Sequence, residues 1–226
     1  MRLHPLFIAA SCTLFGTSAL ALEQPDGTPI PQKELLRDYL DGEGESIDPR
    51  TAAAITPQTF DPNCQLTFKV IARGGGQRNS FGWYNVTGQR PELSDLHEFL
   101  TCTDGVGTER VLDIKNHPAY RGGRIGFFMA TTEGKNPPNC VSFTDGVGPD
   151  PSTLGYLYFS EPQYNDDNEG PDSFIHLIVM DSGAYPQAFY FGWEDLFGGG
   201  DNDFEDLLTR VEGITCAGGG AACETG

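Results

Sequence analysis

The feature that most constrains the fold of this chain is a succession of short apolar and aromatic runs from Cys64 onward. Glycine, proline, asparagine and aspartate separate the runs, and this pattern is typical of many short β-strands joined by turns. We expect nine strands, at residues 65–72, 80–86, 110–114, 124–130, 140–143, 154–159, 174–180, 187–193 and 204–211. Nine strands with little helix predict an all-β fold, namely an antiparallel β-sandwich of the jelly-roll-like kind.

Little of the remaining chain has helical character. Apolar residues at helical spacing within residues 92–100 predict one short helix that covers a sheet end. Residues 33–40 are the only helical candidate in the segment 22–62, which is rich in Pro, Asp, Glu and Gly. That composition predicts a loosely ordered, irregular N-terminal arm. We place the sandwich at residues 63–214, followed by a Gly/Ala-rich tail at residues 215–226.

The first 21 residues have the pattern of an export signal. Arg2 precedes an apolar run at residues 6–20, and an Ala-x-Ala cleavage pattern ends at Ala21. The run is shorter than the roughly 20 residues that span a bilayer, and no second run of this kind follows it. We therefore expect cleavage after Ala21 and a secreted, periplasmic or cell-surface chain without a membrane span.

The charge of the chain narrows the choice of partners. Its 226 residues suit one ordinary domain, and 32 acidic against 14 basic side chains give a formal net charge of −18. A chain with this charge repels nucleic acid and anionic lipid, which argues against both as partners. Divalent cations are the natural counterpart.

The most informative segment follows the strand expected at residues 187–193. Three consecutive glycines at residues 198–200 tolerate positive φ, so the backbone can turn sharply there and return beside its own start. The segment holds six carboxylates within thirteen residues: Glu194, Asp195, Asp201, Asp203, Glu205 and Asp206. Like charges held this closely destabilise a fold unless protons or a cation compensate them.

Calcium is the cation that this composition favours. Carboxylates and carbonyl groups of an irregular loop offer only oxygen ligands, which suit a hard ion that accepts roughly six to eight of them, whereas zinc prefers Cys or His. The spacing is not that of an EF-hand, because Asp206 stands at the sixth position from Asp201, where glycine is required. We expect a calcium site formed by Glu194, Asp195, Asp201, Asp203 and Asp206. The alternative is a solvated acidic turn.

Four further aspartates are secondary candidates for metal binding. Asp166 and Asp167 lie in a second acidic loop, which either supplies ligands or is simply hydrophilic. Asp104 and Asp145 lie in two copies of the pentapeptide Thr-Asp-Gly-Val-Gly, each close after a cysteine. We interpret the two copies as similar turns rather than as a duplicated binding loop.

Three aromatic residues are candidates for ligand binding. A calcium ion with an open coordination position could hold a sugar hydroxyl, while Trp83, Tyr84 or Trp193 stacks on the pyranose ring. Phe189, Phe191 and Trp193 alternate along one expected strand, however, and such residues usually pack inward. We therefore favour core packing for all three candidates and keep carbohydrate binding as the alternative.

Five cysteines follow the export signal, and an oxidising compartment favours disulfides between them. Cys216 and Cys223 flank a Gly/Ala-rich stretch of the tail and could close a small loop. Cys64, Cys102 and Cys140 are spaced 38 residues apart. The spacing leaves open which of them pair, and an odd number leaves one cysteine over.

The acidic segment resembles a known family. The run Trp193-Glu-Asp-Leu-Phe-Gly-Gly-Gly-Asp-Asn-Asp-Phe-Glu-Asp-Leu is similar to the C-terminal signature of the family called domain of unknown function 4114 (DUF4114), found in exported bacterial proteins. Shorter pieces such as Asn79-Ser-Phe-Gly-Trp-Tyr match in order, so the resemblance covers about residues 64–214. It implies a compact β-rich extracellular module, often part of surface or adhesin-like proteins, with the acidic glycine loop as its metal site.

The sequence carries no recognisable catalytic motif. It lacks the nucleophile elbow of hydrolases, the His-Glu-x-x-His zinc motif and the phosphate-binding glycine loop. Paired carboxylates such as Glu194 and Asp195 can hydrolyse glycosides, but neighbours on a strand point to opposite faces. We expect a non-enzymatic calcium-binding module with a structural or ligand-binding role. A calcium-dependent carbohydrate-binding or adhesion protein is the alternative, and a glycoside hydrolase is a more remote one.

Overall fold

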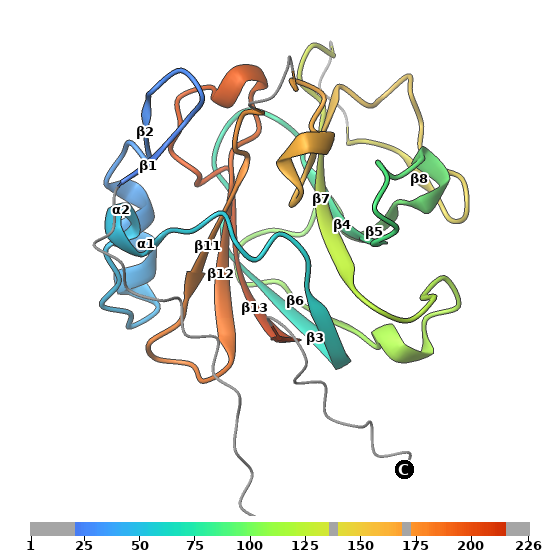
Figure 1. Cartoon of the computed structure of the whole chain (residues 1–226), viewed down its shortest axis with the longest axis horizontal. Coiled ribbons are helices and arrows are strands. Elements are labelled where there is room, and N and C mark those ends of the chain that lie inside the picture. Colours follow the sequence, from blue (N-terminus) through green and yellow to red (C-terminus); the bar gives the residue numbers. More distant parts are fainter. Residues whose placement is uncertain (1–20, 136–139, 169–172, 216–226) are drawn as a thin grey trace, which may run out of the picture.

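The computed structural model describes residues 21–135, 140–168 and 173–215, and its main elements are two antiparallel sheets (Figure 1). The five-stranded sheet has the order β11 (Leu177–Asp181), β12 (Ala188–Trp193), β13 (Leu207–Thr215), β3 (Asp61–Ala72) and β6 (Glu109–Leu112). The four-stranded sheet has the order β10 (Tyr156–Phe159), β7 (Ile125–Thr131), β4 (Ser80–Asn85) and β5 (His97–Leu100). The expected all-β fold is confirmed. Every expected strand except residues 140–143 overlaps one of these strands.

The two sheets face each other across a core of large aromatic side chains. Phe81, Phe127, Phe191 and Trp193 are buried there, with neighbouring ring centroids 5.3–5.8 Å apart. Phe189 and Phe191 on β12 face this core, as Trp193 does, while Tyr190 between the two phenylalanines belongs to the cluster on the opposite side of the sheet. Each buried aromatic ring stabilises the fold by about 2–3 kcal/mol. The alternation of residues along β12 therefore determines which side chains point into the core.

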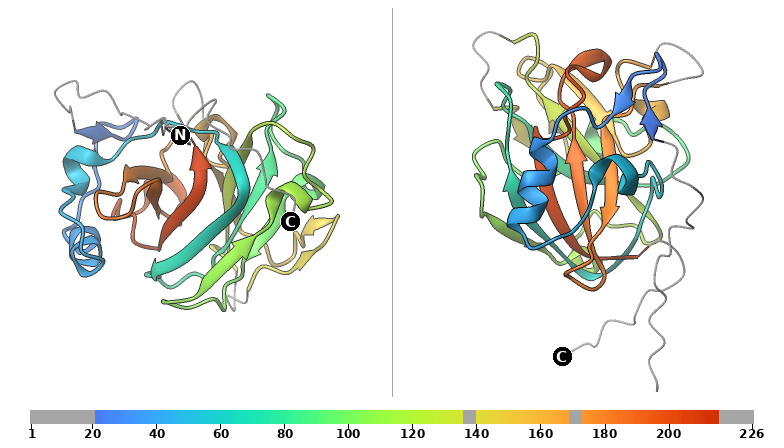
Figure 2. Two further views of the ribbon diagram at one scale, coloured as in Figure 1. Left: turned by 90° about the horizontal axis from the view of Figure 1, so that it is seen from below. Right: turned by 90° about the vertical axis from the view of Figure 1, so that its left-hand side faces the viewer.

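The N-terminal arm covers the outer face of the five-stranded sheet (Figures 1 and 2). It consists of the two-stranded ribbon β1 (Leu22–Glu23) and β2 (Pro29–Ile30), helix α1 (Leu35–Gly42) and the single turn α2 (Pro49–Ala52). The helix expected at residues 33–40 is present as α1. The sequence predicted a loosely ordered arm, but the structure packs it, because Leu36 and Leu40 share one face of α1 and are buried against the sheet.

Loops cover the outer face of the four-stranded sheet. Of the strand expected at residues 140–143, only Phe143 lies in a strand, in the short ribbon of β8 (Phe143–Thr144) and β9 (Gly148–Pro149). Phe143 of this ribbon packs beside Phe128, which belongs to a buried cluster on that face. The inner strands of both sheets are therefore covered on both sides, which explains why β4, β7 and β12 are buried along their whole length.

The helix expected at residues 92–100 is absent. The 3-10 turn η1 (Leu93–Asp95) is followed by strand β5, which pairs with the edge of β4. Leu96 packs on the outer face of the four-stranded sheet, whereas Leu100 lies in the core between the sheets. The apolar residues thus serve two faces of a sheet instead of one helix stripe, and the backbone pairing available at β4 outweighs the helical spacing.

The strands of the two sheets extend from the start of β3 at Asp61 to the end of β13 at Thr215. A disulfide joins Cys102 and Cys140, whose Cα atoms are 5.6 Å apart. The side chain of Cys64 and both Cys216 and Cys223 lie outside what the structure describes, as do the expected export signal before Ala21 and the expected tail from residue 216.

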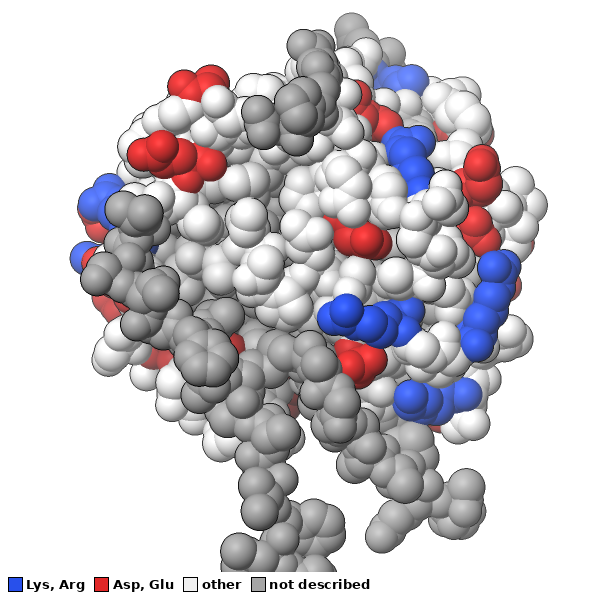
Figure 3. Space-filling model, in the orientation of Figure 1, with Lys and Arg blue, Asp and Glu red and all other residues white. Residues whose placement is uncertain are grey.

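One face of the molecule carries charges of both signs (Figure 3). Acidic and basic side chains are scattered over the face shown in Figure 3. Within the described ranges, no helix combines the length and the apolar character needed to cross a membrane.

Candidate metal centre

The acidic segment is the connection between β12 and β13. Trp193 at the end of β12 pairs with Leu207 at the start of β13, so residues 194–206 leave the sheet and return to it at the same point. This loop contains the short 3-10 turn η4 (Phe197–Gly199). The three glycines at residues 198–200 have φ angles of +71°, +81° and +49°, a conformation that favours glycine. The sharp turn expected from the sequence is therefore present.

The five expected ligands fall into two overlapping groups. We call Glu194, Asp195 and Asp206 the inner group, and Glu194, Asp201 and Asp203 the outer group. In each group the three residues offer oxygen atoms that all lie within 4.8 Å of one another. The inner residues are 0%, 1% and 6% exposed, whereas Asp201 in the outer group is exposed. The fold thus brings all five side chains together around the shared Glu194.

Neutral donors hold the inner group in place. The Asp195 N–H donates to Asp206 Oδ2 at 2.9 Å, and the Asp203 N–H donates to Glu194 Oε2 at 3.2 Å. The Asn79 amide donates through Nδ2 to Asp195 Oδ2 at 2.6 Å. No ion pair in the described part of the chain involves an inner carboxylate. Among the described residues, hydrogen bonds rather than ion pairs therefore stabilise these buried carboxylates.

Burial raises the pKa of each inner carboxyl. It raises the pKa of Glu194 to about 9, helped by the nearby charges of Asp206 and Asp203. Burial and the charge of Asp195 raise the pKa of Asp206 to about 7. The pKa of Asp195 rises to about 6, mainly by burial, although the Asn79 hydrogen bond opposes the shift. In the absence of a cation the inner group thus retains protons near neutral pH.

A second glycine loop completes the inner group, and the sequence analysis missed it. Gly75, in the connection between β3 and β4, has a φ of +69°, and a Cβ atom there would lie 2.5 Å from Asp206 Oδ1. Gly200 in the acidic loop is similar, because its Cβ would lie 2.6 Å from Glu194 Oε1. The two loops approach the carboxylates so closely that only glycine fits. The triple glycine at residues 74–76, which repeats the one at 198–200, was the available signal.

Asn79 is a further residue that the sequence analysis missed as a ligand. It is buried beside Asp195, and its Oδ1 atom has no hydrogen-bond partner. The two ends of an amide are assigned from their hydrogen bonds, so a half-turn of this amide would present the oxygen toward Asp195. An ion bound to Asp195 would favour that orientation, because hard cations accept amide oxygens as ligands.

The outer group differs because it already has a cation. Lys33 Nζ lies 2.5 Å from Asp201 Oδ2 and 3.0 Å from Asp203 Oδ2. Hydrogen bonds to these two carboxylates raise the pKa of Lys33 above its ordinary value. Lys33 belongs to the N-terminal arm, so no sequence motif connects it with the acidic loop.

The four secondary candidates lie outside both groups. Asp167 is buried, accepts the Gly198 N–H at 2.9 Å and lies 2.7 Å from His176 Nε2, so it braces the acidic loop. Asp166 accepts the N–H of Leu157 and pairs with Arg90. Asp104 pairs with Arg110, and Asp145 is exposed on its turn.

The three aromatic candidates are buried. Trp83, Tyr84 and Trp193 are at most 1% exposed, so none offers a ring face to a sugar. Trp83 and Trp193 lie in the core between the sheets, and the Tyr84 hydroxyl donates to Glu161 on the outer face of the four-stranded sheet. Core packing, which the strand alternation favoured, accounts for all three, and the ligand-binding alternative is wrong for these side chains.

The inner group has the chemistry of a hard-cation site. It combines three carboxylates with an amide on an irregular backbone, and neither of the two ligand groups found in the described residues includes a cysteine or a histidine. The arrangement can therefore hold a metal ion.

Comparison with known proteins supports the family resemblance. The model of the family described as Domain of unknown function (DUF4114) matches residues 120–214. This stretch runs from β7 to β13 and includes all the carboxylates of both groups, so the resemblance is confirmed there. The match is shorter than the expected 64–214, and it leaves out Lys33, Gly75 and Asn79. No match was found among curated proteins or among solved structures.

Proposed function

We propose that the chain is an exported calcium-binding module whose fold is completed by one calcium ion in the inner group. The observation that carries this proposal is the burial of Glu194, Asp195 and Asp206 together, without an ion pair from the described residues. Buried carboxylates without a counter-charge are costly, and a divalent cation removes that cost. The oxygen-only donors and the irregular backbone favour calcium among the common cations.

Calcium in this position would act as a structural element. An ion that binds only the folded state stabilises it by mass action, by about 2.7 kcal/mol at a concentration 100 times its Kd. The two strands that the loop joins, β12 and β13, are adjacent in the five-stranded sheet, so the ion would stabilise the hairpin that they form. The folded state of such a module would be less stable where calcium is scarce and more stable outside the cell. Export itself is proposed from the signal-like pattern that ends at Ala21.

The alternative functions have less support. Carbohydrate binding loses its expected stacking residues, because all three aromatic rings are buried. Glycoside hydrolysis requires two carboxyls that flank an open sugar site, whereas the inner carboxyls are buried and hydrogen-bonded. We therefore propose a structural rather than a sugar-binding role for the ion.

Calorimetric titration of the purified, chelator-treated protein with calcium tests the proposal. We expect binding in the wild type and its loss in Asp195→Asn/Asp206→Asn, which keeps the size of both side chains. The control Asp41→Asn/Asp113→Asn removes the same charge at two exposed positions and should bind as the wild type does. Equal calcium affinity in the inner-group variant and the wild type would reject the inner group as the site.

Thermal unfolding separates the structural role from a sugar-binding role. With a structural ion, a chelator lowers the melting temperature of the wild type and leaves that of the inner-group variant unchanged. Glycan binding that requires calcium and disappears with a chelator would instead support the carbohydrate-binding alternative.

A further inference from the structure

The outer group is unusual because its cation comes from a distant part of the same chain. Lys33 is separated by 168 residues from Asp201, yet its ammonium contacts the carboxylates of both Asp201 and Asp203. These two residues and Glu194 place their oxygens within 4.8 Å of one another, as the inner group does. The ammonium thus lies where a second metal ion would find its ligands.

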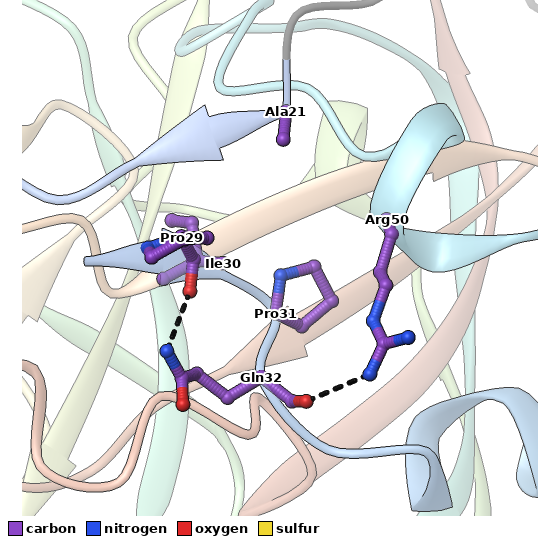
Figure 4. A pocket seen from close by; sticks show the side chains of 6 residues that line it. All are labelled: Ala21, Pro29, Ile30, Pro31, Gln32 and Arg50. Atoms are coloured by element: carbon purple, nitrogen blue, oxygen red, sulfur yellow. Dashed lines mark hydrogen bonds between the residues drawn. The ribbon is translucent and has the colours of Figure 1, made fainter. Parts of the chain in front are cut away.

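The position of Lys33 is fixed by its chain neighbour. The Gln32 N–H donates to the carbonyl of Asn202, which stands between Asp201 and Asp203, at 2.8 Å. On the other side, Arg50 donates to the carbonyl of Gln32 at 3.0 Å, as Figure 4 shows. Gln32 is therefore held between the arm and the acidic loop, and Lys33 follows directly after it.

A second contact anchors the arm to the same loop residue. Gln24 donates through Nε2 to Asn202 Oδ1 at 2.6 Å and to the carbonyl of Ile175 at 3.0 Å. The Gln24 carbonyl oxygen Oε1 in turn accepts the Ile175 N–H at 2.8 Å. Gln24 is buried, so this anchor does not depend on Lys33. The arm would keep its place if the Lys33 side chain were shortened or made neutral.

We propose that Lys33 is a tethered cation that takes the place of a second divalent ion in the outer group. This inference rests on the proposed function, because it assigns one of two adjoining cation positions to calcium and the other to the chain itself. An ammonium and a divalent ion cannot share the same two carboxylates at contact distance, since their charges repel. The arm therefore limits the loop to one calcium ion, and the chain provides the second positive charge.

Counting bound calcium in Lys33→Met tests the inference. Methionine keeps the length and apolar stem of the side chain but removes its charge. We expect calorimetric titration to find one calcium ion in the wild type and two in Lys33→Met. Lys33→Arg should bind one ion, and Lys115→Met, which removes an exposed charge elsewhere, should also bind one. Hydrogen exchange over residues 22–57 checks that the arm of Lys33→Met remains docked through Gln24.

The outcomes distinguish this inference from the proposed function. One ion in both the wild type and Lys33→Met, with affinities within about twofold, would overturn the role of Lys33 and leave the calcium site intact. Two ions in the wild type would overturn it as well. If the wild type binds none and Lys33→Met binds one, the proposed inner site fails, while the competition by Lys33 is supported. Adding Asp201→Asn/Asp203→Asn to Lys33→Met should return the count to that of the wild type.

Discussion

The inner and outer groups share Glu194 but compensate their negative charge in different ways. The inner group lies in the interior, and protons and neutral donors are its only partners among the described residues. The outer group opens to solvent, and Lys33 supplies its positive charge, with Lys33 and Asp201 46% and 52% exposed. Exposed ion pairs contribute little to stability, whereas uncompensated buried charge costs much. A lysine of the same chain therefore compensates the outer carboxylates, while the inner carboxylates depend on protons or on the metal ion that we propose for them.

Removing the shared residue should have the largest effect. We expect Glu194→Gln to lower calcium affinity by at least about 100-fold, because it removes a charged ligand from the buried group. Glutamine resembles the protonated side chain that a pKa of about 9 implies at neutral pH, so stability in chelator at pH 7 should change little. Calorimetry and thermal unfolding measure the two effects. Glu109→Gln, at an exposed position, is the control.

The second largest effect is expected in the pH dependence of the melting temperature, which reports on the inner group. The folded-state pKa values of Glu194, Asp206 and Asp195, about 9, 7 and 6, exceed their ordinary values of 4.5 and 3.8. Protons therefore stabilise the metal-free fold, and that contribution is lost as pH rises through these values. In chelator we expect the melting temperature to fall by about 5–10 °C between pH 5 and pH 9, and in excess calcium to fall less. A melting temperature in chelator that rises over this range would contradict the uncompensated inner group.

The same shifts predict that calcium displaces protons. At pH 7 we expect the release of about one to two protons per ion, chiefly from Glu194 and Asp206. Titrations in buffers with different ionisation enthalpies measure this number. The release should decline toward pH 10, and affinity should increase with pH over the same interval. Release that does not vary with pH would mean that the ion binds elsewhere.

Adding a side chain at Gly75 should have an intermediate effect on stability and on calcium affinity. Gly75→Ala places a Cβ 2.5 Å from Asp206 Oδ1 at a positive φ, which we expect to destabilise the fold by about 1–2 kcal/mol and to weaken calcium binding by about tenfold. Gly76→Ala is a matched control, because a Cβ at Gly76 meets no atom within 4 Å and its φ is not positive. Urea unfolding and calcium titration compare the two. Equal effects at both positions would show that loop stiffness, and not contact with Asp206, matters.

The smallest effect is expected at the exposed end of the outer group. Asp201→Asn should change calcium affinity by less than about threefold, since Asp201 is half exposed and already paired with Lys33. Asp206→Asn, the same change in the inner group, should cost much more. Comparable losses of calcium affinity in the two variants would show that the inner and outer groups form one site.

Local patterns allowed much of the fold and site to be predicted. The alternation of Phe189, Phe191 and Trp193 predicted the strand and its buried face, and the triple glycine predicted the return of the acidic loop. Both depend on residues that are close in sequence, where geometry follows from the residue types.

The remainder depended on contacts between distant segments. The helix expected at residues 92–100 became β5 because β4 offered it an edge to pair with, which no local pattern records. Lys33 and Asn79 meet the acidic loop across 168 and 116 residues. The packing of the arm also escaped prediction, since its few apolar residues are diluted by polar ones and stabilise the arm only against the sheet.

The order of strands in the two sheets limits how this module can be shortened. β3 lies between β13 and β6, and β4 lies between β7 and β5, yet both strands precede the family match that begins at residue 120. A fragment cut to residues 120–214 would leave β13 and β7 each with an unpaired edge and would expose part of the aromatic core to water. Unpaired edges promote aggregation. Transferring the acidic hairpin to another protein as a candidate cation site therefore requires the entire sandwich, with its arm attached.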